Sequence, residues 1–594
     1  MKRIISLLLC VSMLATMLVV PAFAAAYTPG VYTGEGTGMN AETPIVVEVT
    51  FSETAITDVK VISHAETAGL SDPAFAAIPG AIVEKQSLAI DAMAGATLTS
   101  KGILAAVEAA AVQAGADVAA LKAVAADSET AAKAETEQTA DVVVVGAGVA
   151  GLTAALAAKE AGADVIVIEK MAVAGGTTLL AGGILVSVDS ELFAENRLET
   201  DNLESVLAYW KARQSKSGVE SGYPDYDRLT SVLADTGETV DWLVANDVQF
   251  SAEPYAASTA YPMALANGGG AGLIAMLQAS VESRGVKLIT GCKATSLITD
   301  ETGAVVGVKA ETADENITFH AKSVVMATGG ISQNQELVEK YSPKLARAGL
   351  VPTSSVSHTG EGFLMALEAG AGTFDVFATP LFNIVVDPAL EGGAGLTIYS
   401  QLGVNANGVR FANEAAAAGW DVMDHTASDM IQDGNAPFWY IYDSANADVA
   451  AILENGAAAG VVAKGETIEE LALNMHVYTA NLKASYDAYS AAVAAGADEQ
   501  FGKPAMFLQP IAQAPFYAVK VYPTTFGSAG GVTTTEDGRV TRQDGTVIPG
   551  LYAAGEMSNR YFYNENYVLA ASLGLYTTMG RRAGTAAAQD AAAK

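Results

Sequence analysis

One stretch, Asp141–Lys170, constrains the fold of this 594-residue chain more than any other. It begins with Val142–Val145, a continuous β-branched run that is typical of a strand buried on both faces. Three glycines follow in G-x-G-x-x-G spacing: Gly146, Gly148 and Gly151. In a strand–turn–helix unit the first allows a tight turn, the second lets a pyrophosphate approach the backbone, and the third lets helix and strand pack closely.

The residues after these glycines complete a βαβ unit. Leu152–Glu160 is predicted to be the helix, whose N-terminal N–H groups would face the phosphates. Val165–Ile168 is predicted to be the second strand. Glu169 at its tip stands about 20 residues past the glycines, where an acid accepts the ribose hydroxyls. The stretch therefore predicts a dinucleotide site, with either NAD or FAD as the ligand.

Composition narrows the partners. The formal net charge is −33, and 51% of the residues are hydrophobic. A strongly acidic surface disfavours nucleic acids and anionic lipid surfaces as ligands. The length and the apolar content suit several large, well-packed α/β domains.

The N-terminus has the pattern of a secretory signal peptide. Lys2 and Arg3 precede an apolar stretch, Ile4–Val20, and Ala22–Ala24 forms an A-x-A cleavage site. We expect cleavage after Ala24 and therefore an extracytoplasmic bacterial protein, which is secreted, periplasmic or at the cell surface. The alternative is an uncleaved anchor, for which the apolar stretch is barely long enough.

Cysteine content limits the redox chemistry. The chain has two cysteines, and Cys10 lies within the expected signal peptide. Cys292 would then be alone, which excludes an intramolecular disulfide, a Cys-based metal site and an iron–sulfur cluster. No His, Asp and Glu residues cluster with metal-ligand spacing. Redox chemistry must therefore come from a flavin or from a partner.

The chain divides by texture into five parts after the signal peptide. Alternating strands and a helix fill a small first domain, and an Ala-, Glu- and Thr-rich linker follows. Two segments with the sequence pattern of a nucleotide-binding domain then follow, and a segment of different composition lies between them. The boundaries are 27–115, 116–139 (the linker), 140–374, 375–522 and 523–594. We expect a small α+β domain, then an α/β, Rossmann-like domain with an inserted α+β capping domain.

The first domain resembles the FMN-binding domain of extracytoplasmic flavoproteins, most specifically in Asp91–Ser100, DAMAGATLTS. In that family a dedicated flavin transferase esterifies FMN to the Thr of a D-x-x-[S/T]-G-A-T motif. The resemblance implies that Thr97 carries covalent FMN and that Asp91 is the recognition acid. Ala94 departs from the motif, and the alternative is a turn that caps the helix Lys101–Gln113.

The remainder, Ala140–Lys594, resembles the fumarate reductase/succinate dehydrogenase flavoprotein superfamily, in its single-chain secreted branch. The matching segments are Gly175–Thr178, Ala327–Gly330, Thr359–Gly362, Asn405–Glu414, Pro515–Ala518 and Gly550–Glu556. By this resemblance the dinucleotide is FAD. The residues implied in its binding are Gly146, Gly148, Gly151, Glu169, Lys170, Gly175, Gly176, Thr177, Ala294, Thr328, Gly329, Gly360, Gly362, Glu556, Ser572 and Leu573.

The resemblance also implies roles within that set. Glu169 and the first three glycines hold the ADP half, and Glu556 lies at the ribityl hydroxyls. Ser572 and Leu573 present backbone N–H groups to the pyrimidine edge of the isoalloxazine, which suits a negatively charged reduced flavin. The implied reaction is hydride transfer between flavin N5 and a carbon β to an activating carbonyl, with a proton added to the α carbon.

Three departures argue against fumarate as the substrate. Ala418 stands where fumarate reductases have a proton-donating Arg, and Gly527–Gly531 replaces their H-T-M-G-G motif. The H-G-x-N-R-L-G motif becomes Asn559–Tyr567, NRYFYNENY. The loss of the Arg also argues against urocanate where a urocanate reductase keeps the same Arg.

The replacement run supplies catalytic candidates. By analogy with ketosteroid dehydrogenases, Tyr567 or Tyr563 could polarise a carbonyl, since a tyrosine with its ordinary pKa of about 10 is a neutral donor at pH 7. Arg560 could bind a substrate carboxylate. The aromatic residues could instead pack under the flavin, and Arg560 could be a surface residue. Arg410 either holds Glu414 or takes part in catalysis.

These features together predict a two-flavin reductase. Covalent FMN would receive electrons from a membrane-associated donor and pass them to FAD, which would reduce an activated C=C bond of an aromatic or bulky unsaturated acid or enone. His425 and Trp420 could also face the substrate. The alternatives are a ketosteroid-dehydrogenase-like desaturase, a urocanate reductase and a non-catalytic electron carrier. The oligomeric state is left open.

The signal peptide is tested by N-terminal sequencing of the protein secreted by its bacterial host. Because the A-x-A site ends at Ala24, the mature chain is expected to begin at Ala25. An intact Met1 on the exported protein would contradict cleavage.

Overall fold

The computed structural model describes residues 27–40, 43–66, 71–90, 92, 96–122, 133–215, 222–255, 261, 263–378, 383–399, 402–415, 420–564, 567–568 and 571–594. The chain forms two compact units, Met1–Ala132 and Lys133–Lys594. The expected signal peptide lies outside the described residues. Within the described parts, no helix is long and apolar enough to cross a membrane.

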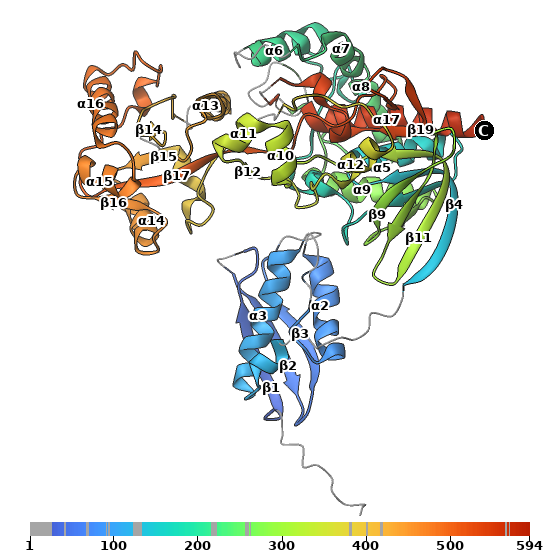
Figure 1. Ribbon diagram of the computed structural model, residues 1–594, viewed down its shortest axis with the longest axis horizontal. Helices are drawn as coiled ribbons and strands as arrows, with labels where there is room; N and C mark the ends of the chain where they lie inside the picture. The colour runs from blue at the N-terminus through green and yellow to red at the C-terminus, as the bar shows by residue number, and fades with distance from the viewer. Residues whose placement is uncertain are drawn as a thin grey trace, which may run out of the picture. The chain divides into compact units, whose positions relative to one another are not determined.

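The first unit is a small α+β domain. Its strands are β1 (Gly30–Gly36), β2 (Ile45–Phe51) and β3 (Ile56–Ser63), and its helices are α2 (Asp72–Lys85), α3 (Thr97–Gln113) and α4 (Val118–Lys122). The strands form an antiparallel sheet in chain order, with α2 and α3 packed on it (Figure 1). A Cβ added at Gly34 would lie 2.0 Å from the Ala106 carbonyl oxygen, so glycine is what lets α3 lie this close to β1.

The second unit is organised around an eight-stranded sheet. Its strands are β4 (Ala134–Val145), β5 (Val165–Ile168), β8 (Lys287–Ile289), β9 (Lys293–Thr299), β10 (Val305–Glu311), β11 (Glu315–Met326), β18 (Arg539–Thr541) and β19 (Val547–Ala553). The order is β18-β19-β11-β4-β5-β8, and β10 joins β11 to β9. The pairs among β19, β11, β4, β5 and β8 are parallel, so their carboxyl ends share one edge of the sheet.

Both faces of this sheet are covered, as the Val142–Val145 run predicted. One face carries α5 (Val149–Glu160), α6 (Leu203–Ser215), α7 (Tyr226–Ala234), α8 (Thr236–Ala245), α9 (Gly269–Ser283), α17 (Ala571–Ala592) and the hairpin β6 (Ile184–Val186) and β7 (Met263–Leu265). The other carries α10 (Gln335–Tyr341) and α12 (Glu361–Glu368). Val142 and Val144 enter the first core, whereas Val143 and Val145 enter the second.

A separate six-stranded sheet forms the cap. Its strands are β12 (Val351–Pro352), β13 (Asn383–Val386), β14 (Leu402–Val404), β15 (Phe438–Tyr442), β16 (Ala463–Gly465) and β17 (Phe516–Thr525). Its helices are α11 (Pro343–Ala348), α13 (Trp420–Asp433), α14 (Ala447–Ala458), α15 (Ile468–Met475) and α16 (Thr479–Ala495). Tyr440 and Trp439 in β15 belong to different cores, so both faces of this sheet are covered as well. The long β17 leads from the cap towards the nucleotide sheet (Figure 1).

This arrangement confirms the expected fold class, but two boundaries differ from those drawn from the sequence. Strand β4 begins at Ala134, whereas the linker was expected to run to Thr139; residues 134–139 pair in parallel with β11. Their side chains are mostly exposed or half-buried, so their polar composition resembles a linker although their backbone is fully paired. The cap also recruits α11 and β12, which precede the expected boundary at residue 375, because Leu345 and Ala348 pack in its core.

Candidate functional site

A cavity of about 410 Å³ lies at the carboxyl ends of β4, β5 and β11. Such an edge of a parallel sheet is where dinucleotides bind. All residues expected to bind FAD line this cavity, except Gly151 and Gly360. The fold thus brings segments from the beginning, middle and end of the second unit into one site.

Gly151 acts behind the cavity. A Cβ added there would lie 1.9 Å from the Gly146 carbonyl oxygen, so any side chain would push α5 away from the turn that follows β4. Gly146 itself has φ of +104°, and a Cβ on it would lie 2.4 Å from the Ala327 carbonyl oxygen. These two glycines therefore fix the turn and the approach of the helix.

Two other glycines face the cavity and leave room for a ligand. A Cβ added at Gly148 would find the Gly175 carbonyl oxygen nearest, at 3.7 Å, and one added at Gly176 would find no atom within 4 Å. Helix α5 begins at Val149, so its first N–H groups and the positive end of its dipole face the same space. The residues present therefore fit the diphosphate of FAD.

Glu169 lies at the tip of β5, as the spacing predicted. Its carboxylate accepts hydrogen bonds from the N–H groups of Ala147 and Met171, both at 2.8 Å. Burial nevertheless raises the pKa of Glu169, because desolvation outweighs these two bonds. A carboxyl group held so rigidly at the cavity wall suits the ribose hydroxyls of a dinucleotide.

Lys170 and the Thr359–Gly362 segment form the neighbouring wall. Lys170 Nζ donates to Thr359 Oγ1 at 2.7 Å and to Glu361 Oε2 at 3.0 Å. A Cβ added at Gly362 would lie 2.0 Å from Thr328 Oγ1, so this glycine lets the start of α12 lie against Thr328. Gly360 has φ of +80° and caps the helix from outside the cavity.

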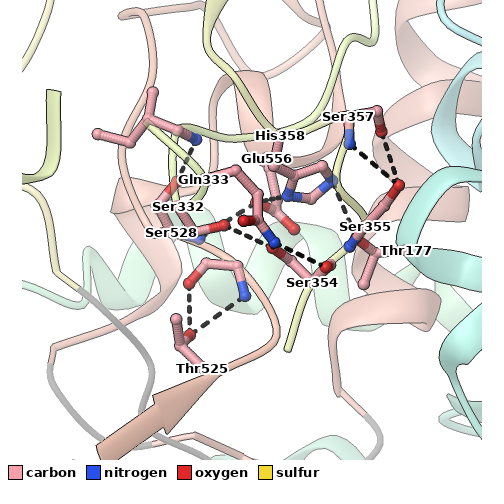
Figure 2. Close-up of polar contacts among 12 residues, drawn as sticks. Thr177, Ser332, Gln333, Ser354, Ser355, Ser357, His358, Thr525, Ser528 and Glu556 are labelled. Atoms are coloured by element: carbon pink, nitrogen blue, oxygen red, sulfur yellow. Dashed lines mark hydrogen bonds and ion pairs between the residues drawn. The ribbon is translucent and has the colours of Figure 1, made fainter. Parts of the chain in front are cut away.

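A buried polar pair that the sequence did not indicate lies in the same wall. His358 Nδ1 and Glu556 Oε2 are 3.5 Å apart, and His358 Nε2 lies 2.9 Å from Thr177 Oγ1 (Figure 2). Burial lowers the pKa of His358 to about 4 and raises that of Glu556 to about 8. The one available signal for His358 was its position directly before the matched Thr359–Gly362 segment.

Aromatic side chains also line the cavity. Tyr255, Phe526, Tyr567 and Tyr576 are among its lining residues, as are Ser572 and Leu573. Arg213, which the sequence did not single out, donates to the Tyr567 carbonyl oxygen through Nε and Nη2, at 3.3 and 3.0 Å. Among the described residues that line the cavity, the basic side chains are Lys170, Lys293 and His358, and no arginine is present.

The two candidate tyrosines differ in their position relative to the cavity. Tyr563 is fully buried, does not line the cavity, and its hydroxyl lies 2.9 Å from Ser572 Oγ. Its ring packs against Trp210, with 5.7 Å between the ring centroids. Tyr563 thus supports Ser572 from behind, whereas half-buried Tyr567 reaches the cavity.

Neither candidate arginine lines this cavity. Arg560 is buried, and its Nε donates to the Val376 carbonyl oxygen at 3.0 Å, its Nη1 to that of Tyr563 at 2.5 Å. It is therefore not a surface residue, and its described contacts hold the backbone that supports Tyr563. Arg410 lies in the cap, where it makes bidentate contacts with Glu414 and Asp498 at 2.7–3.1 Å. The structural role considered for Arg410 agrees with this placement.

The predicted FMN site falls partly outside the described residues. Thr97 is the first residue of α3, and its side chain, like Asp91, is not described. Glu66 holds this end of the helix, because its carboxylate accepts from Thr99 Oγ1 and from the N–H groups of Met39 and Asn40, the last two at 3.1 and 2.9 Å. The side chains of Trp420 and His425, and all of Ala418, are also not described.

Thiol or metal chemistry finds no support in the described part of the chain. Cys292 is buried in the cavity wall, and burial raises its thiol pKa to about 11, so it is a poor nucleophile. Among the described residues, no group of three or more His, Cys, Asp and Glu side chains could hold a metal ion.

Comparison with known proteins supports both cofactor-binding domains. Residues 141–570 match the family model described as FAD binding domain, and residues 40–112 match the FMN-binding domain. Urocanate reductase from Eggerthella lenta is 29% identical and is matched over 94% of this chain and 92% of its own. Vinyl phenol reductase from Lactiplantibacillus plantarum is 30% identical over 70% of this chain and 89% of its own.

Other relatives are longer or known as structures. NADH:acrylate oxidoreductase from Vibrio harveyi is 30% identical over 90% of this chain, which spans only 58% of that protein. The open conformation of a flavocytochrome c3 fumarate reductase has a TM-score of 0.58 at 26% identity, covering 76% of this chain and 79% of its own. A 3-ketosteroid-Δ4-(5α)-dehydrogenase from Rhodococcus jostii has a TM-score of 0.57 at 27% identity, covering 78% and 99%.

The cradle at Gly148 is tested by Gly148→Val. The added Cβ makes only an ordinary contact, at 3.7 Å with the Gly175 carbonyl oxygen, but the side chain enters the space for the diphosphate, so FAD binding should weaken by about 100-fold while the chain still folds. FAD fluorescence quenching measures the affinity, and far-UV circular dichroism checks the fold. Gly80→Val, at an exposed helix position with no atom within 4 Å of its Cβ, is the matched control. Unchanged FAD affinity in Gly148→Val would contradict this site.

Proposed function

Because this chain is an oxidoreductase of the fumarate reductase/succinate dehydrogenase flavoprotein family, we propose that it reduces an activated C=C bond in an aromatic or bulky unsaturated acid or enone. Its relatives include proteins named urocanate reductase, vinyl phenol reductase and NADH:acrylate oxidoreductase. Urocanate, vinyl phenol and acrylate each contain a C=C bond beside an activating or aromatic group. These relatives support the class of reaction, and the residues that line the cavity of this chain support the choice of substrate.

One observation favours a bulky substrate over fumarate. The described wall of the cavity contains no arginine, whereas Tyr255, Phe526 and Tyr567 are among its lining residues. Lys170 and Lys293 share the single carboxylate of Glu361, at 3.0 and 3.8 Å, so one positive charge at most is left for a substrate. A dicarboxylate would lose its hydration without gaining a bidentate partner, whereas an aromatic ring would gain apolar contact.

FAD in this cavity would supply the hydride. The chain's own residues bind and orient the reactants. The start of α17 presents Ser572 and Leu573, and Tyr563 supports Ser572 through its hydroxyl. We assign to the Tyr567 hydroxyl the polarisation of the substrate carbonyl or the delivery of the α proton. Arg213 holds the backbone of Tyr567 at its carbonyl oxygen, which positions this side chain.

We propose further that electrons enter through FMN esterified to Thr97 by a flavin transferase that recognises Asp91. The match of residues 40–112 to the FMN-binding domain supports this, and covalent FMN is typical of that family. A membrane-associated donor would then reduce FMN outside the cytoplasm, in line with the signal peptide expected at residues 1–24. Both partners follow from the FMN domain and not from any contact in the structure.

A second reaction direction has one observation in its favour. The likeness to the ketosteroid dehydrogenase extends over almost the whole of that chain, and that enzyme was solved in complex with a steroid ketone, 4-androstene-3,17-dione. A desaturase of a saturated ketone would use the same cavity and the same tyrosine in reverse. An FMN inlet for electrons favours the reductive direction, because a desaturase must dispose of electrons. Oxidation of saturated ketones by the full chain, faster than reduction of the enones, would support the desaturase.

Substrate preference is tested with reduced viologen as the electron donor and a panel of fumarate, urocanate, aryl acrylates and cyclic enones. We expect turnover of the aryl acrylates or enones and none of fumarate. Turnover of fumarate alone would refute the proposal.

Tyr567→Phe removes one hydroxyl and should lower kcat by about 100-fold or more without loss of FAD. Tyr486→Phe, which removes a hydroxyl bonded to the Ile511 carbonyl oxygen in the cap, should have no such effect.

Flavin attachment is tested by the intact mass of the chain after co-expression with a flavin transferase. An FMN-sized addition is expected on the wild-type chain and should be absent from Thr97→Ala, which lacks the acceptor hydroxyl. Thr57→Ala, at an exposed threonine in a strand of the same domain, should retain it. Retention of the addition in Thr97→Ala would show that another residue is the acceptor.

A further inference from the structure

We propose that His358 and Glu556 form a buried pair in the wall of the FAD cavity, in which Glu556, wherever it is ionised in the oxidised protein, takes up one proton when the flavin beside it gains negative charge on reduction. The role concerns the cofactor and not the substrate. It therefore goes beyond the proposed reductase activity and can be tested without any substrate.

The side chains of the pair are largely shielded from water by the described residues. The His358 and Glu556 side chains are only 6% and 9% exposed, and His358 Nδ1 lies 3.5 Å from Glu556 Oε2. Among the described residues Nδ1 has no hydrogen-bond partner, although Glu556 Oε2 lies within ion-pair distance of it. Both residues line the cavity.

The histidine ring is held in place from its other side. His358 Nε2 lies 2.9 Å from Thr177 Oγ1, and that oxygen accepts a hydrogen bond from the Ser355 N–H at 2.9 Å (Figure 2). A Cβ added at Gly329 would lie 2.6 Å from Nε2, so the ring fills the space over this glycine. The ring is therefore fixed with Nδ1 3.5 Å from Glu556 Oε2 and has little freedom to turn away.

The carboxyl group of Glu556 is equally confined. The Ser528 N–H donates to Oε2 at 3.2 Å. A Cβ added at Gly330 or Gly527 would lie 2.3 Å or 2.2 Å from a carboxyl oxygen, so both glycines are needed to admit the group. One N–H bond offers a buried carboxylate far less than water does, and the neutral acid is favoured.

The charged and titratable groups around the pair do not reverse this preference. Lys170 acts on His358 and disfavours its cationic form, while its own Nζ contacts Glu361 at 3.0 Å. Tyr563 and Tyr576 face Glu556 from the segment before α17 and from α17 itself, and burial raises the pKa of both, so they stay neutral. With burial raising the pKa of Glu556 to about 8 and lowering that of His358 to about 4, the pair holds one proton, on the carboxyl group, at neutral pH.

Reduction of the flavin then couples to the pair in a pH-dependent way. Two electrons and one proton convert the neutral isoalloxazine into an anion, with the electrons supplied by the enzyme's own reductant. An anion in the cavity disfavours a second negative charge and raises the pKa of Glu556 further. Below about pH 8 the carboxyl group already carries its proton, so no more is bound. Above that pH the oxidised protein holds a carboxylate, and reduction adds one proton to it.

The test is the FAD midpoint potential measured against pH between about 7 and 9.5. The full chain is produced without a flavin transferase, so that FAD is its only flavin. In the wild type we expect the slope to double above about pH 8, from one proton to two per electron pair. Glu556→Gln keeps a neutral amide at this position and should retain the one-proton slope throughout.

Two further variants make the result specific. His358→Ala lets water reach the carboxylate, so the change in slope should move to lower pH. His320→Ala removes an exposed histidine that lies 3.3 Å from Glu137 on the same sheet, and should leave the wild-type curve unchanged. If Glu556→Gln fails to hold FAD, the His358→Ala curve decides, and an unmoved change in slope overturns the proposal. Identical curves for the wild type and Glu556→Gln also overturn it. Because no substrate is used, either failure leaves the proposed reductase activity standing.

Discussion

The close approach of α5 to the turn after β4 is the constraint on which the rest of the second unit depends. Gly151 allows it, because any side chain there would overlap the Gly146 carbonyl oxygen. Helix α17 repeats the device on the far side of α5, where Cβ atoms at Gly580 and Gly584 would lie 2.3 and 2.1 Å from the carbonyl oxygens of Ala150 and Ala154. Two helices packed this closely both begin at the cavity, so two positive dipole ends meet the same ligand.

Burial, rather than pairing, sets the protonation of three groups in the cavity wall. Glu169, His358 and Glu556 all have pKa values shifted in the direction that favours the uncharged form, and desolvation is the largest cause in each case. A cap built on its own two cores has the opposite solution, in which the buried Arg410 is held by two carboxylates. The two cases differ because a buried charge that contacts no ligand needs an opposite charge from the protein itself. Groups at a cofactor site can be compensated by the cofactor instead.

Much of the FAD site could be predicted from the sequence because it is built from backbone and from contiguous motifs. Glycine spacing, a following helix and an acid at a strand tip carry their geometry with them wherever the fold places them. The catalytic tyrosine could not be predicted in the same way. Tyr563 and Tyr567 are the same residue type in one short run of sequence. Only the tertiary structure distinguishes them, because it packs Tyr563 on Trp210 and Ser572. The composition of residues 134–139 predicts a linker, because pairing with β11, and not the side chains, makes this part of β4 a strand.

By itself the sequence determined the class of cofactor and the class of fold, since both follow from local patterns that need no distant partner. The tertiary structure decided which polar groups meet. It brought His358, from the loop before α12, to Glu556, which follows β19, and it turned Arg560 away from the cavity to bind backbone carbonyls. Such meetings depend on how whole layers pack, and side chains from separate elements carry no mark in the sequence of the neighbours that packing will give them.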